Sequence, residues 1–197
     1  MKKEELLNLE FSEENDKYRL QLYFAHDEKG IVYRATSVLS ANRWNILGAT
    51  IRSLENGQVE DEFLIQSSEG KVLDETELDL LKQEMLSIFS EEISIPTYLI
   101  KKNRKAIAEK GNPNAMIQIE SGNSESSIKM RIKTNDREGL LCDIARIFYL
   151  ECVDILSVNA RTIGDIVDDT FELQAESGSA LDKTILERLE KNLRNIL

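Results

Sequence analysis

Apolar and polar residues alternate along residues 128–134, which is the period of a strand with one buried face. Ile128, Met130 and Ile132 form the apolar side, and lysine and arginine stand between them. The stretch YRLQLYF, residues 18–24, is the corresponding segment earlier in the chain. A strand is therefore predicted at each place.

A helix is predicted after each of these strands, because apolar residues then recur every three or four positions. That spacing places them along one side of a helix, where they can face a core. In the later helix the apolar positions are Leu141, Ile144, Ala145, Phe148 and Cys152.

The two halves of the chain repeat each other. Residues 27–53 align with residues 136–162 at a constant offset of 109. One extra residue in the first copy then changes the offset to 108, and VEDEF (59–63) matches VDDTF (167–171). A register kept this long with a single insertion predicts two domains of the same fold.

Each copy is predicted to contain a strand, a helix, two strands and a second helix. Asn56 with Gly57, and Gly164 with Asp165, mark the turn between the two later strands. With room for a final strand, this is the ferredoxin-like βαββαβ plan of an α+β fold, with antiparallel sheets and helices on one face. The second helices are predicted to open at Leu73 and Asp74, and at Leu181 and Asp182.

The ends of the copies allow additional strands. Residues 96–100 are interpreted as the strand that closes the first domain. Residues 115–120 are interpreted as an extra strand entering the second domain, with residues 7–11 as their counterpart. The predicted first domain spans residues 1–100, a basic linker spans residues 101–114, and the second domain spans residues 115–197.

The charge of the chain restricts the classes of partner that it can bind. A net charge of −11 and a pI near 4.8 oppose binding to a phosphate backbone, so no nucleic-acid partner is expected. No apolar run approaches a membrane span, and acidic residues follow Lys2 and Lys3 where a signal peptide needs apolar ones. A cytoplasmic location without a membrane partner is expected. Cys142 and Cys152, ten residues apart, have neither a metal nor a redox spacing and are interpreted as buried free thiols.

The linker concentrates positive charge in an otherwise acidic chain. We interpret this run as a solvated connector, and an anion-binding or nucleic-acid patch is the alternative. Its cations are Lys101, Lys102, Arg104, Lys105 and Lys110, with Glu109 as the one acid.

The second copy carries a recognisable series of motifs, DREGLLCDIARIF followed by DILSVNARTIGDIVDDTF. It resembles the ACT domain, and in particular the tandem pair at the C-terminus of the PII uridylyltransferases, which modify a nitrogen-signalling protein. The first copy matches more loosely, with AHDEKG in the turn. The likeness covers roughly residues 18–90 and 127–197, and it implies two ACT domains in tandem.

The resemblance implies a ligand site in the loop between the first strand and the first helix, completed by a neighbouring unit and typically used for amino acids. The amides of a helix's first turn suit a carboxylate, and an aspartate beside them suits an ammonium group. The residues implied are Asn135, Asp136, Gly139 and Leu140 in the second unit, and His26, Asp27, Gly30 and Ile31 in the first.

A purely structural role for these turns stays open. An aspartate before a helix is also a routine N-cap, and His26 is either a ligand contact or an exposed loop residue. Many members of the family have proline just before the glycine, where Lys29 and Glu138 stand here. Glutamate suits a helix N-terminus and lysine opposes the helix dipole, so the second turn is expected to be better formed.

No enzyme is predicted. The uridylyltransferases carry their catalytic domains upstream of the ACT pair, and this chain has no room for them. His26 is the single histidine, which argues against a histidine-based metal site or a Ser-His-Asp triad, and no phosphate-binding loop is present. The pairs Glu60–Asp61 and Asp168–Asp169 are interpreted as solvated strand faces, with a catalytic dyad as the alternative. No metal and no cofactor are expected.

The favoured function is a non-catalytic regulatory module that binds a glutamine-like amino acid, acts by allosteric regulation and is linked to nitrogen or amino-acid metabolism. A homodimer or a separate regulated protein is the expected partner. The alternative is a ligand-independent interaction or dimerisation module. RNA binding is a third class, but the candidate strands ILGATIRSL and ILSVNARTI lack the aromatic residues it needs.

Overall fold

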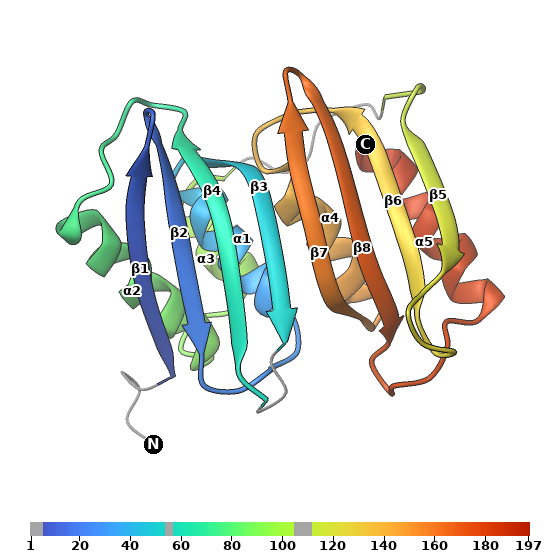
Figure 1. Cartoon of the computed structure of the whole chain (residues 1–197). Helices are drawn as coiled ribbons and strands as arrows, with labels where there is room; N and C mark the ends of the chain where they lie inside the picture. The colour runs from blue at the N-terminus through green and yellow to red at the C-terminus, as the bar shows by residue number, and fades with distance from the viewer. Residues whose placement is uncertain (1–5, 54–56, 105–111) are drawn as a thin grey trace.

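A computed structural model describes residues 6–53, 57–104 and 112–197. Within these ranges the chain is an α+β fold, with one antiparallel sheet and all helices on one of its faces (Figure 1). The strands are β1 (Leu7–Glu14), β2 (Lys17–Phe24), β3 (Trp44–Ser53), β4 (Val59–Ser67), β5 (Met116–Ser121), β6 (Ile128–Asn135), β7 (Val153–Ile163) and β8 (Ile166–Ala175). The helices are α1 (Ile31–Ala41), α2 (Glu75–Phe89), α3 (Ile95–Lys101), α4 (Leu140–Leu150) and α5 (Lys183–Ile196).

The two repeated units share a single sheet. Its strand order is β1-β2-β4-β3-β7-β8-β6-β5, so the second half is the first half in reverse (Figure 1). The units meet where β3 pairs antiparallel with β7, from Gly48 opposite Arg161 to Arg52 opposite Ser157. Helix α1 packs against α4 above the same border. Backbone hydrogen bonds and a helix contact therefore join the repeats about an approximate two-fold axis.

The α+β fold class predicted from the sequence is confirmed, and the edge strands show how each unit is completed. In each unit the outer strand precedes the repeated elements, as β1 beside β2 and β5 beside β6. The prediction that residues 96–100 form a closing strand is wrong, because they lie in α3. Ser94 caps this helix by accepting a hydrogen bond from the Thr97 amide, and β1 already occupies the sheet edge that a closing strand would take.

Local sequence signals account for where several elements begin and end. Asp74 and Asp182 cap α2 and α5, accepting hydrogen bonds from the amides of Glu77 and Ile185. Gly164 has φ of 60° in the turn between β7 and β8. The matching turn in the first unit contains Gly57, which has φ of 79°. Its predicted partner Asn56 lies outside the described residues.

The cysteines differ from each other. Cys142 is buried in α4, as expected. Cys152 is exposed, so its predicted burial is wrong: α4 ends at Leu150, and Cys152 follows it with φ of 55°. The boundaries at residues 100 and 115 stay predictions.

The core lies between the sheet and the helices. Phe63 on β4 and Phe171 on β8 are equivalent in the repeat and fully buried, one in each unit. Phe148 packs against Phe171, with ring centroids 5.2 Å apart. In the described ranges, no helix is long and apolar enough to cross a membrane.

We expect the two units to unfold together, because they share backbone pairing as well as a helix contact. Phe63→Ala and Phe171→Ala are each expected to lower the free energy of unfolding by about 3–5 kcal/mol, the usual cost of removing a buried ring. Urea denaturation followed by circular dichroism should show one transition for either variant. Two separate transitions, with only one of them moved by each substitution, would show independent units.

Candidate ligand site at the border of the two units

The helices α1 and α4 begin in the same unusual way. Their N-cap residues, Gly30 and Gly139, have φ of 73° and 74°, in the left-handed region that favours glycine. No side chain caps either helix. Asp27 and Asp136, three residues earlier, therefore do not act as N-caps, and capping does not account for their presence in both repeats.

The second turn faces the first unit. Asp136 is half-buried, and its side chain hydrogen-bonds to Asn45, which belongs to β3 of the other unit. Burial raises the pKa of the Asp136 carboxyl, although that hydrogen bond and nearby Arg137 oppose the effect. A cavity of about 20 Å³ lies beside this contact and has Asp169 in its lining. It has room for about one water molecule.

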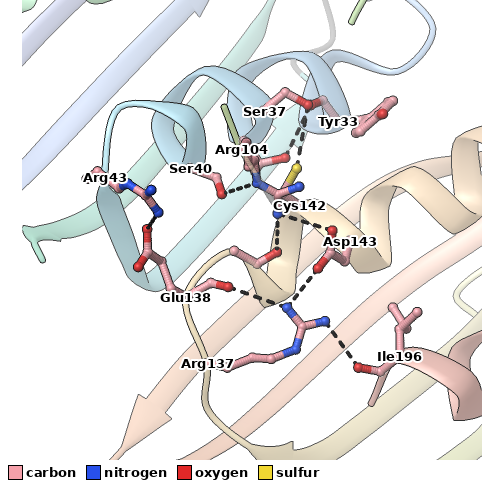
Figure 2. A network of polar contacts seen from close by, with 12 residues as sticks. Tyr33, Ser37, Ser40, Arg43, Arg104, Arg137, Glu138, Cys142, Asp143 and Ile196 are labelled. Carbon is pink, nitrogen blue, oxygen red and sulfur yellow. Dashed lines mark hydrogen bonds and ion pairs between the residues drawn. The ribbon is translucent and has the colours of Figure 1, made fainter. Parts of the chain in front are cut away.

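An arginine from the segment after α3 covers this turn. Arg104 donates through Nε to the Ser40 hydroxyl at 2.6 Å and through Nη2 to the Gly139 carbonyl at 3.2 Å (Figure 2). Nη2 also lies 3.1 Å from Oδ1 of Asp143. The Arg104 side chain is only 11% exposed, so it is an integral part of the turn. The interpretation of this connector as solvated is wrong for Arg104, and Lys105 and Lys110 lie outside the described residues.

Asp143 joins a second arginine to the same network. Its side chain is 2% exposed, and its Oδ2 atom accepts a hydrogen bond from Arg137 at 2.7 Å (Figure 2). Arg137 also donates to the carbonyl of Ile196 at the end of α5. The carboxylate lies in the first turn of α4, where the helix dipole favours negative charge. Two arginines and the helix end thus compensate this buried charge.

The first turn is covered differently. The ring of Tyr149, from α4 of the other unit, lies against Gly30, where a β-carbon would collide with it at 2.5 Å. Lys29 lies 5.5 Å from the centroid of this ring and forms an ion pair with Glu176 at 2.5 Å. Tyr149 is the repeat equivalent of Ser40, so a large ring closes one turn while a small hydroxyl leaves room for Arg104 at the other.

Charge also differs between the two turns. The repeat equivalent of Asn45 is Asp154, so the first turn places Asp27 near a second carboxylate instead of an amide. Burial and the charge of Asp27 raise the pKa of the Asp154 carboxyl. A cavity of about 30 Å³ includes both residues in its lining. This turn therefore has an excess of negative charge that suits a cationic group.

Two buried carboxyls lie beneath the turns. Asp61 is 0% exposed and Asp169 is 3% exposed, so the interpretation of both acid pairs as solvated faces is wrong for these members. Burial raises the pKa of Asp169 to about 7, against a hydrogen bond from the Arg161 amide. Burial raises the pKa of Asp61 as well, against a hydrogen bond from the backbone of Arg52, the repeat equivalent of Arg161. Each interacts electrostatically with the turn aspartate of its own unit, Asp27 or Asp136.

The structure separates the implied site residues into two groups. His26 is exposed and lines a different small cavity with Phe24 and Phe89, and Asn135 is exposed at the end of β6. The others lie around the two border cavities: Asp136, Gly139 and Leu140 at the second turn, and Asp27, Gly30 and Ile31 at the first.

Sequence reasoning missed several residues of these turns. Asp61 and Asp169 are identical at equivalent positions of the two repeats, a signal that could have indicated a shared buried role. Asn45 and Tyr149 reach the turns only because the units meet through β3 and α4. The basic run containing Arg104 gave no sign of which cation is buried.

Comparison with known proteins confirms the resemblance inferred from the motifs. No protein-family model matches the chain. The bifunctional uridylyltransferase/uridylyl-removing enzyme of Idiomarina loihiensis is 26% identical over 96% of this chain and 22% of its own length. The enzyme of Ruegeria pomeroyi is 28% identical over 97% of this chain and 21% of its own length. The enzyme of Haemophilus influenzae is 25% identical over 88% of this chain and 19% of its own length.

The chain spans about a fifth of the length of these curated relatives, and it matches their C-terminal region. Among solved structures, aspartate kinase from Synechocystis is similar with a TM-score of 0.47 and 15% identity, over 90% of this chain and 27% of the kinase. That likeness is too weak to support a further conclusion.

Substitution of Gly139 tests how tightly the second turn is covered. Gly139→Ala is expected to cost about 1–3 kcal/mol for displacing Arg104 and Ser40, beyond about 1–2 kcal/mol of left-handed strain. Gly70→Ala is the matched control, because Gly70 has φ of 73° and open space around it. Chemical denaturation of both variants should show a larger loss for Gly139→Ala. Equal losses would mean that Arg104 and Ser40 do not restrict this position.

The pKa of Asp169 predicts how stability varies with pH. Because the folded-state pKa is raised, the folded protein keeps a proton between about pH 4 and about pH 7 that the unfolded chain has lost. The free energy of unfolding should therefore fall as pH rises through this window, by up to about 4 kcal/mol. Asp169→Asn should flatten this fall in melts recorded across the range.

Asp168→Asn is the control for this measurement, because Asp168 should change the free energy of unfolding with pH in the opposite direction. The hydrogen bond with Arg131 lowers the pKa of Asp168, so its stabilising contribution is present at neutral pH and lost on acidification. A variant at Asp169 whose stability profile follows that of the unchanged protein would contradict the assignment of a raised pKa.

Proposed function

We propose that this chain is a non-catalytic regulatory module that binds a small amino acid, glutamine or one of similar size and polarity, at the turns before α1 and α4. The observation that carries the proposal is the pairing of each turn with the opposite unit. The uncapped first turn of α4 lies beside Asp136, whose hydrogen-bond partner Asn45 comes from the first unit. A ligand held there would contact both units at once.

The chemistry of the turns suits a zwitterion. The first-turn amides of a helix attract a carboxylate, and no side chain caps those of α1 or α4. The aspartates at both turns suit an ammonium group, and Arg104 already places a cation on the Gly139 carbonyl and Asp143. We infer that the guanidinium occupies the position that the positive end of a ligand would take.

Binding would require the border to move. The cavities of about 20 and 30 Å³ have room for about one water molecule each and are too small for an amino acid. Entry must displace Arg104 or Tyr149, or separate α1 from α4. A ligand that prefers the opened arrangement shifts the population toward it, and this shift is the proposed regulatory signal. The similarity to uridylyltransferases supports a regulatory role linked to nitrogen or amino-acid metabolism.

A ligand-independent interaction module is the second candidate. Side chains of the chain itself close both turns, which favours a border that serves only to hold the units together. The edge strand β5 exposes Met116 and Ile119, at 37% and 39%, and offers a place for a second copy or a regulated protein. This candidate predicts a molecular mass that does not respond to amino acids.

Calorimetric titration with each of the standard amino acids tests the proposal. A ligand at a hundred times its dissociation constant should raise the free energy of unfolding by about 2.7 kcal/mol. Asp136→Asn should weaken binding at least about tenfold, whereas Asp16→Asn, which removes the same charge at the exposed turn after β1, should not. Absence of heat and of any thermal shift, with a constant mass by light scattering, would leave the interaction module as the function.

A second arm asks whether Arg104 occupies the ligand position. Arg104→Gln is expected to tighten amino-acid binding, because the internal competitor is removed while Arg137 still compensates Asp143. Lys101→Gln is the matched control, since Lys101 is an exposed cation three residues earlier. Equal affinity in the two variants would place the ligand away from Arg104.

A further inference from the structure

A third cavity, much larger than the two at the turns, lies in the helix layer. Its volume is about 420 Å³, and it opens between α1, α4 and the segment 91–96, which includes the start of α3. The two turn cavities measure only about 20 and 30 Å³. Pockets for small molecules usually range from about 300 to about 1,000 Å³. This cavity therefore has room for an organic molecule without any movement of the units.

One wall of the cavity is apolar and aromatic. Tyr33 and Tyr149 contribute rings with centroids 5.5 Å apart, and Ile93 and Pro96 lie in the same lining. Leu150 also belongs to it and is 62% exposed. Exposed leucine beside two tyrosine rings offers a surface for an apolar group of about the size of a benzene ring or a short alkyl chain.

The lining also contains two arginines that lack strong acidic partners. Arg34 is 12% exposed, and its guanidinium donates to the Phe89 carbonyl at 3.3 Å. The nearest carboxylate, that of Glu91, is 3.8 Å away on a side chain that is 83% exposed, so this ion pair is weak. Arg146 is exposed and forms no ion pair with any residue that the structure describes.

The other unit shows what a complete pairing looks like at the same position. Asp143 is the repeat equivalent of Arg34, and it is enclosed by two arginines at 2.7 and 3.1 Å. Arg34 has no comparable partner, although the chain carries a net charge of −11 and has carboxylates in excess. Two under-compensated guanidinium groups at one cavity of an acidic protein indicate a place for an anion.

We propose that this cavity binds a small amphipathic anion. A carboxylate or phosphate group would be held by Arg34 and Arg146, and an apolar body would lie against Ile93, Pro96 and the ring of Tyr149. Glu91 competes for Arg34 from solvent and would be displaced. The site is distinct from the turns before α1 and α4, and it does not depend on amino-acid binding there.

Four small probes test this assignment on the whole chain: phenyl phosphate, phenylacetate, octanoate and the neutral phenylacetamide. Calorimetry should detect binding of the anions and at least about tenfold weaker binding of phenylacetamide. The first two probes distinguish a phosphate from a carboxylate site, and octanoate reports whether the body must be aromatic. Equal binding of phenylacetamide and phenylacetate, or no heat with any probe, would overturn the proposal.

Two pairs of variants locate the site. Arg146→Gln should weaken binding of the anions at least about tenfold. Arg52→Gln, at an exposed arginine on β3, should leave their affinity unchanged. Ile93→Trp should fill the cavity and abolish binding, while Leu80→Trp, at a 41% exposed position on α2, should not. Thermal melts confirm that each variant is folded. Full affinity in Arg146→Gln or in Ile93→Trp would place the anion elsewhere.

Discussion

The antiparallel pairing of β3 with β7, together with the contact of α1 with α4, is the constraint on which the rest of the structure depends. Each repeat alone has an unpaired strand edge and an uncovered helix side at this border. Joining them satisfies the backbone groups of both strands and buries the facing sides of both helices. The same contact brings the turn residues of one unit against side chains of the other.

The two turns are therefore reciprocal in position but unequal in chemistry. Where the second turn meets Ser40 and Asn45, the first meets their equivalents Tyr149 and Asp154. The charge before the glycine is reversed as well. Glu138 pairs with Arg43 at 3.1 Å, and Lys29 pairs with Glu176 across the border. Lysine at a helix N-terminus is unfavourable in isolation. The ion pair of Lys29 with Glu176 and its contact with the ring of Tyr149 compensate for this cost.

Buried acids connect stability with the proposed binding. Asp61 and Asp169 lack the positive partners that enclose Asp143, so burial favours their neutral forms. A cation near either turn would favour ionisation of the acid beneath it. Burying the carboxyl groups of Asp61 and Asp169 is unfavourable, and an ammonium group near them would reduce that cost. The proposed binding should therefore depend on both the pH and the charge of the ligand.

Local pattern was enough for the elements that local physics decides. The strand and helix periods, the caps at Asp74 and Asp182, and the glycine turns are all encoded within a few residues of where they act. The repeat also indicated the position of the turns, of which Asp27, Asp136 and the two glycines line the border cavities. Residues 96–100 were misassigned because a short apolar run suits strand and helix alike, and only the occupied sheet edge decides between them.

The amino-acid sequence by itself determined the α+β class, the two units and the conformation of their turns, because these follow from periodicity and backbone sterics. Only the tertiary structure decided which side chains meet there. Arg104 is one cation in a basic run, and Asp169 is one acid in an alternating strand, until the border buries them. Burial and partner choice depend on contacts between residues far apart in the chain, and no local spacing records those contacts.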